Sequence, residues 1–94
     1  MNKEKIKTYI GFAIKSRQIV FGVDSIKEKK PYIIIYSNSL SELSKNGCVK
    51  ASNKNNSKIY EISDDEMFDI VGNDKIKALA ILNKDLAKAI EENM

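Results

Sequence analysis

The sequence predicts a three-layer α/β/α sandwich, in which helices cover both faces of a four-stranded sheet. Segments with helical periodicity alternate along the chain with four short apolar stretches that favour β-structure. Two of these stretches, Tyr32 to Tyr36 and Ala78 to Leu82, show no polar alternation, which is typical of strands buried on both faces. The 94 residues are enough for one such domain, spanning residues 1–94, and leave no room for a second.

The first two predicted helices flank a short strand. One apolar stripe at three-and-four spacing predicts the first helix and consists of Ile6, Tyr9, Ile10, Ala13 and Ile14. The stretch Ile19 to Phe21 predicts the first strand, which ends at Gly22. A second helix of about two turns is predicted over Val23 to Lys30, with Asp24 in its first turn and lysines in its last. Pro31 prevents this helix from continuing.

Serine residues divide the middle of the chain into elements. The turn Ser37-Asn38-Ser39 ends the second strand. Ser39 and Glu42 have the spacing of a capping box, which predicts a helix that runs through Leu40, Leu43, Gly47 and Ala51 toward Asn53. A polar loop over residues 53–57 follows and precedes the third strand, predicted over Lys58 to Ile62.

The last third of the chain contains two more capped helices and one strand. Ser63 and Glu66 form a second capping box, and Gly72 ends the short helix that follows. The inner side of this helix is predicted to carry Met67, Phe68, Ile70 and Val71. After a mostly charged loop over residues 73–77 comes the fourth strand. Asn83 caps the final helix, whose inward-facing residues are predicted to be Leu86, Ala89 and Ile90.

The composition excludes several classes of enzyme. The chain has no histidine and a single cysteine, Cys48, so zinc fingers, histidine-based triads and an internal disulfide are excluded. No glycine-rich phosphate loop is present. Because no base is available to activate its thiol, Cys48 is predicted to be a small core residue. We therefore expect a protein without catalytic activity and without a cofactor.

The charged residues leave the choice of partner open. The acidic run Asp64-Asp65-Glu66 follows a predicted helix cap, where negative charge is favoured by the helix dipole. No further carboxylates are placed to complete a metal site. We therefore expect no bound metal. The 16 basic and 13 acidic residues give a net charge of +3, which is compatible with a polyanionic partner. A lysine-rich genome would explain the same composition.

No apolar run in the sequence is long enough to span a bilayer. Met1 to Glu4 lead into an amphipathic helix rather than into the core of a signal peptide. We expect a cytoplasmic protein that does not bind membranes, and a monomer, with a dimer as the alternative.

Three polar segments are candidates for one binding surface. Gly22 ends the first strand, the Ser37-Asn38-Ser39 turn ends the second, and the Asn73 to Lys77 loop precedes the fourth. In α/β sandwiches, ligands bind where such loops and helix starts meet at one end of the sheet. We hypothesise that these three segments meet there. A purely structural role is the alternative, because Asp24 and Ser25 are ordinary residues in a first helical turn.

The order of elements and several local patterns resemble the kink-turn RNA-binding superfamily, which includes the ribosomal proteins L-seven-Ae and L-thirty-e. The likeness is greater to the small bacterial ribosomal-protein-like members, and it covers nearly the whole chain. It rests on the order and spacing of the segments Gly11 to Ser16, Ile19 to Gly22, Tyr32 to Asn38, Ile70 to Gly72 and Ala80 to Lys88. The resemblance implies an L-thirty-e-like sandwich whose four-stranded sheet is mixed.

The resemblance also implies where RNA would bind. In RNA-binding members, a Gly-x-Asn-Glu sequence at the second helix start contacts the sheared G·A pairs of a kink-turn. The loop after the fourth helix contacts the same RNA. The implied RNA-binding residues of this chain are Gly22, Asp24, Ser25, Lys27, Arg17, Lys15, Asn38, Lys75 and Ile76. The four basic residues among them would contact phosphates, and the aliphatic loop residue would pack against an unstacked base.

The chain has the glycine of the family pattern at Gly22 but departs from the pattern in the residues that follow. Asp24 and Ser25 stand in place of asparagine and glutamate, and Glu28 stands in place of a basic residue. A carboxylate only accepts hydrogen bonds, whereas an amide both donates and accepts. The leading hypothesis is a non-enzymatic, ribosome-associated protein that recognises a kink-turn or similarly structured RNA. The alternative is a protein-interaction module of the same fold that has lost specific base recognition.

Overall fold

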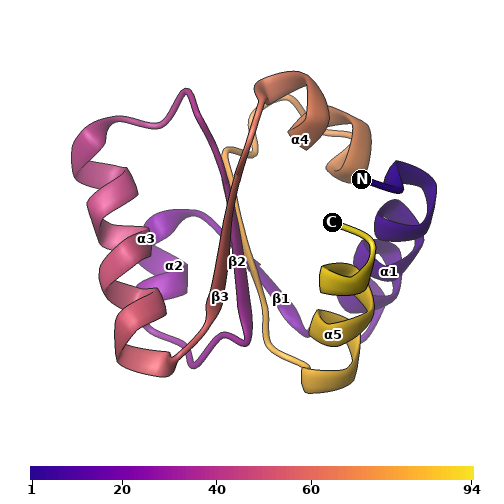
Figure 1. The fold of residues 1–94 in the computed structure, drawn as a ribbon, viewed down its shortest axis with the longest axis horizontal. Coiled ribbons are helices and arrows are strands. Elements are labelled where there is room, and N and C mark those ends of the chain that lie inside the picture. The colour runs from indigo at the N-terminus through magenta and orange to yellow at the C-terminus, as the bar shows by residue number, and fades with distance from the viewer.

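Five helices and four strands alternate along the chain in the computed structural model, which describes residues 1–94 (Figure 1). The elements are α1 (Lys3–Lys15), β1 (Ile19–Phe21), α2 (Val23–Lys27), β2 (Ile33–Ser37), α3 (Glu42–Asn55), β3 (Lys58–Ile62), α4 (Asp64–Val71), β4 (Ala78–Ile81) and α5 (Lys84–Glu92). This order confirms the α/β class predicted from the sequence.

The four strands form one mixed sheet in the order β1-β4-β2-β3. β4 lies between β1 and β2 and runs antiparallel to both, with Leu79 opposite Phe21 on one side and Ile35 on the other. β2 and β3 are parallel, so the chain crosses between them through α3. The expected four-stranded mixed sheet is therefore present.

Helices cover both faces of the sheet. α2 and α3 lie on one side, and α1, α4 and α5 lie on the other (Figure 1). Successive residues of β2 alternate between the two apolar cores: Ile33 and Ile35 belong to a cluster of 12 buried residues, and Ile34 belongs to a cluster of 6. The smaller cluster also contains Ile26 of α2 and Cys48 of α3, so Cys48 is a core residue as predicted.

Two helices differ from their predicted boundaries. α2 ends at Lys27 instead of Lys30, because Ile26 is its only buried residue and Pro31 disfavours helical backbone just before it. α3 begins after Ser41, whose side chain accepts a hydrogen bond from the Ser44 N–H, and it extends to Asn55. The predicted Ser39–Glu42 capping box and the inclusion of Leu40 in this helix were therefore wrong.

Several residues predicted to face inward are exposed. An α-helix turns by about 100° per residue, so Ile14 lies about 80° around α1 from the buried Ile6. The Ile14 side chain is therefore at the edge of the apolar stripe and is 48% exposed. Phe68 on α4 is 51% exposed. Tyr32 is also exposed, because β2 begins at Ile33, one residue later than predicted. On α5 Ala87, rather than Ala89, is fully buried beside Ile90.

Most local end signals were predicted correctly. Ser63 and Glu66 form the reciprocal capping box of α4, and Gly72 ends this helix in the left-handed conformation at φ 80°. The Asn83 side chain accepts a hydrogen bond from the Leu86 N–H at the start of α5. None of the helices is long and apolar enough to cross a membrane.

α2 and α3 approach each other at Gly47, which is buried on α3. A Cβ atom at this position would lie 2.9 Å from Val23 Cγ1 and 2.9 Å from Lys27 Cε. Both distances are shorter than normal van der Waals contact. Glycine at position 47 therefore allows α2 to pack directly on α3.

We predict opposite effects of alanine at two helical glycines. Gly47→Ala lowers the free energy of unfolding by about 1 kcal/mol, because overpacking against Val23 outweighs the gain in helix propensity. Gly11→Ala raises it by about 0.5–1 kcal/mol, since a Cβ there meets no atom within 4 Å. Urea unfolding of both variants measures the two changes. A Gly47→Ala protein as stable as Gly11→Ala would contradict the close packing of α2 on α3.

Candidate nucleic-acid interface

The three polar segments singled out in the sequence meet at one end of the sheet. β1 and β2 both end where the antiparallel β4 begins. The Gly22 N–H donates a hydrogen bond to the Ala78 carbonyl at 2.9 Å, and the Ser37 N–H donates one to the Lys77 carbonyl at 2.8 Å. We call this region, formed by Gly22, Ser37–Ser39 and Asn73–Lys77, the loop end. The hypothesis that these segments gather is confirmed.

Gly22 turns the chain from β1 into α2. Its backbone angles, φ 88° and ψ 149°, lie in a region that is essentially restricted to glycine. The next residues, Asp24 and Ser25, are exposed on the first turn of α2, and their side chains make no hydrogen bond or ion pair within the protein. Both side chains are therefore available to a partner at the loop end.

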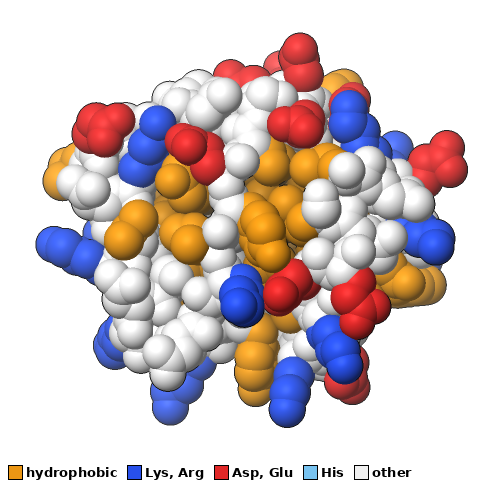
Figure 2. Space-filling model, viewed as in Figure 1, with side chains coloured by type: hydrophobic (Ala, Val, Ile, Leu, Met, Phe, Trp, Pro, Cys, Tyr) orange, Lys and Arg blue, Asp and Glu red, His pale blue; other side chains and the backbone are white.

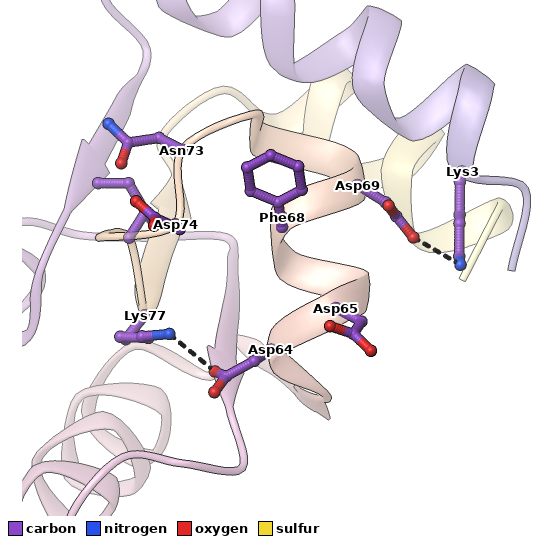
Figure 3. Close-up of a pocket in the computed structure, with 9 residues that line it drawn as sticks. Lys3, Asp64, Asp65, Phe68, Asp69, Asn73, Asp74 and Lys77 are labelled. Atoms are coloured by element: carbon purple, nitrogen blue, oxygen red, sulfur yellow. Dashed lines mark hydrogen bonds and ion pairs between the residues drawn. The ribbon is translucent and has the colours of Figure 1, made fainter.

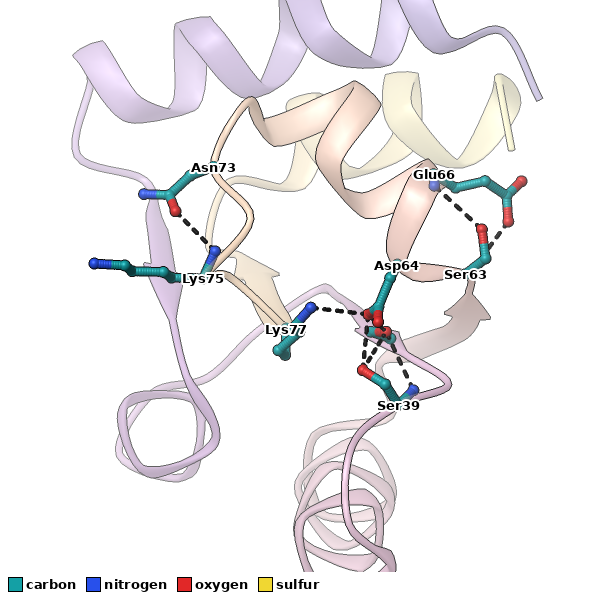
Figure 4. A network of polar contacts seen from close by, with 8 residues as sticks. Ser39, Ser63, Asp64, Glu66, Asn73, Lys75 and Lys77 are labelled. Atoms are coloured by element: carbon teal, nitrogen blue, oxygen red, sulfur yellow. Dashed lines mark hydrogen bonds and ion pairs between the residues drawn. The ribbon is translucent and has the colours of Figure 1, made fainter.

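Asp64, the first residue of α4, joins the polar groups of the loop end. Its carboxylate accepts hydrogen bonds from the hydroxyls of Ser37 and Ser39 and forms an ion pair with Lys77 Nζ at 3.1 Å (Figure 4). These hydrogen bonds, with Lys77 beside them, lower the pKa of Asp64 to about 2. The network connects the end of β2, the start of α4 and the residue before β4.

The role of Asp64 was not recognised in the sequence. The capped first turn of α4 already accounted for an acidic residue at this position. No sequence pattern links Asp64 to Ser39 and Ser37, which precede it by 25 and 27 residues. A turn with two serines after a buried strand was the only available signal, because a buried hydroxyl such as that of Ser37 requires a partner.

A hydrogen bond from within the loop itself stabilises the conformation of the loop before β4. Asn73 Oδ1 accepts a hydrogen bond from the Lys75 N–H at 2.9 Å (Figure 4). The Lys75 side chain is exposed and forms no ion pair. Ile76 is half-buried against the larger core, so only part of its side chain is accessible to a base.

A hollow of about 540 Å³ lies between α4 and this loop (Figure 3). Its charged lining consists of Asp64, Asp65, Asp69, Asp74, Lys3 and Lys77. Both lysines are already paired, Lys77 with Asp64 and Lys3 with Asp69 at 2.8 Å, which leaves two unpaired carboxylates. This side of the loop end is therefore acidic and repels phosphate.

The structure brings together most of the predicted RNA-binding residues. Gly22, which precedes Asp24 and Ser25, and Asn38 follow the strands on either side of β4, and the loop of Lys75 and Ile76 leads into β4 between them. Lys27 lies at the other end of α2, about 6 Å from its start along the helix axis.

Lys15 and Arg17 lie apart from the loop end. Both precede β1, and the Leu82 N–H donates to the Gln18 carbonyl at 2.8 Å, which places them near the opposite end of the sheet. Arg17 there adopts a left-handed backbone conformation with φ 57°. A three-residue strand, about 10 Å long, separates them from Gly22.

The sequence matches no family model and no curated protein. Its fold is similar to a solved structure of a protein of unknown function from Bacillus halodurans C, with a TM-score of 0.74 and 12% sequence identity. The match covers 94% of each chain. This similarity shows that the α/β sandwich extends over nearly the whole chain, and it carries no information about function.

The low pKa of Asp64 predicts a specific dependence of stability on pH. A carboxylate with a pKa lowered from 3.8 to about 2 on folding stabilises the protein above pH 4, and this contribution is lost as the pH falls toward 2. We expect Asp64→Asn to be less stable than the wild type at pH 6 and to lose less stability between pH 4 and 2. Asp65→Asn, next to it and without a partner, should behave like the wild type. Urea midpoints across this range measure the effect, and equal acid sensitivity of Asp64→Asn and wild type would contradict it.

Proposed function

We propose that this chain is a non-enzymatic, cytoplasmic RNA-binding protein of the kink-turn type, which recognises structured RNA near the ribosome. The observation that carries the proposal is the meeting of the Gly22 turn, the Ser37–Ser39 turn and the Asn73–Lys77 loop at one end of the sheet. These are the segments that the resemblance to the kink-turn superfamily implies for RNA contact. The Asp64 network holds two of them in fixed positions, which favours recognition of a shaped RNA.

The charges of the loop end favour one direction of approach. The acidic hollow lies on the α4 side, whereas Lys75 and Lys27 are exposed and unpaired. Lysines contact phosphates without regard to sequence, so they supply affinity rather than specificity. We propose that the RNA lies over the start of α2 and away from α4.

The acidic hollow supports a second candidate function. Two unpaired carboxylates, Asp65 and Asp74, lie beside the half-exposed ring of Phe68 (Figure 3). A lysine or arginine side chain of a partner protein fits such a site, because the ring face and the carboxylates both attract a cation. In this case the fold would serve as a protein-interaction module without base recognition.

A gel-shift titration distinguishes the two functions. We expect the protein to bind a kink-turn RNA more tightly than the same RNA with Watson–Crick pairs in place of its sheared G·A pairs. Equal affinity for both, falling steeply with salt, would reduce the function to backbone binding. No binding to either RNA, together with a stable protein partner in a pulldown, would favour the interaction module.

Restoring the family pattern should increase specificity. Asp24→Asn with Ser25→Glu supplies an amide that both donates and accepts at a guanine edge. A bidentate base contact is worth about 1–3 kcal/mol, so we expect the preference for the kink-turn RNA to rise at least fivefold. Asp24→Ala with Ser25→Glu is the matched control, since it has the same net charge as the first variant and lacks only the amide. An equal gain in both variants would show that the amide at position 24 does not read the base.

A further inference from the structure

A basic groove lies between α2 and α3, on the side of the sheet opposite the acidic hollow. It has a volume of about 220 Å³ and is lined by Lys27, Lys50, Lys54, Gly47, Ala51 and Asn55. The lining residues of α3 follow one helical face, because they are spaced by three and four positions. Three lysines from two helices therefore surround one shallow depression.

The close packing at Gly47 fixes the position of one of these lysines. The Lys27 side chain lies across Gly47, with its ammonium nitrogen 3.4 Å from where a Cβ would be. Lys50 and Lys54 follow about one and two turns further along α3. The ammonium groups thus lie along a path that starts at the end of α2 and runs toward the end of α3.

The charges of this groove have no counter-charges within the protein. None of the three lysines forms an ion pair or a hydrogen bond, although the acidic residues Asp24 and Glu28 also belong to the α2 segment. No acidic residue occurs from Leu43 to Tyr60. In Figure 2, the lower left of the molecule, over the C-terminal half of α3, shows lysine side chains, whereas acidic side chains gather along the top. Like charges four residues apart destabilise a helix slightly, so a bound anion would relieve repulsion between Lys50 and Lys54.

We propose that this groove binds the sugar–phosphate backbone of the RNA as it leaves the loop end. The inference rests on the proposed function and adds α3 to the RNA-binding surface. α2 connects the two regions, because it begins at Gly22 and its last residue is Lys27. The groove is smaller than the usual pocket for a drug-sized ligand and open to solvent, and lysines are point charges that suit single phosphates.

The test compares two lysine pairs with the same spacing. Lys50→Ala with Lys54→Ala removes two charges from the groove, and Lys84→Ala with Lys88→Ala removes two from α5, on the other face of the sheet. All four side chains are exposed, so both variants should fold, which circular dichroism checks. We expect the α3 variant to bind kink-turn RNA about tenfold more weakly and its salt slope to fall by about one per lysine. Its preference over the Watson–Crick control RNA should be unchanged.

The possible outcomes separate this inference from the proposed function. If the α3 variant loses no more affinity and salt dependence than the α5 variant, the groove does not bind the backbone. If Lys50→Arg with Lys54→Arg retains wild-type affinity while the alanine variant loses it, positive charge at this site is required. If the wild-type protein binds neither RNA, the proposed function fails, and the inference fails with it.

Discussion

The hydrogen bonds that β4 makes with β1 and β2 determine where the polar segments of this protein meet. Because β4 runs antiparallel to both neighbours, its first residues lie beside the last residues of both. The bond from Gly22 to Ala78 and the bond from Ser37 to Lys77 close this end of the sheet. β4 is fully buried and contributes to both cores, so the geometry of the loop end depends on the most protected strand of the fold.

The hollow beside α4 and the groove between α2 and α3 have opposite charge, although the whole chain is only weakly basic. Carboxylates of α4 and the following loop line the hollow on one side, and unpaired lysines of α2 and α3 line the groove on the other. Such a separation would orient a polyanion more strongly than the net charge suggests. Not every lysine at the loop end is available to a phosphate, because Lys77 already forms an ion pair with Asp64.

Local signals predicted most of the fold, because continuous apolar runs, capping boxes and a C-terminal glycine act within a few residues. Ser63 and Asn83 cap the starts of α4 and α5, and Gly72 ends α4, as their patterns indicate. Long-range contacts were not predictable from one sequence. Ser39 was predicted to cap α3, but its hydroxyl donates to Asp64, 25 residues away, and Ser41 caps the helix instead. The distance of Lys15 and Arg17 from Gly22 likewise follows from the direction of β1.

We propose that RNA contacts the loop end, and amide chemical-shift mapping by NMR would locate this contact. A ¹⁵N-labelled protein titrated with a kink-turn RNA should show its largest shifts at Gly22 to Ser25, Ser37 to Ser39 and Asn73 to Lys77. Residues of α5, on the far side of the sheet, should remain unchanged. Shifts centred on α5, or the same small shifts over the whole surface, would rule out RNA binding at the loop end.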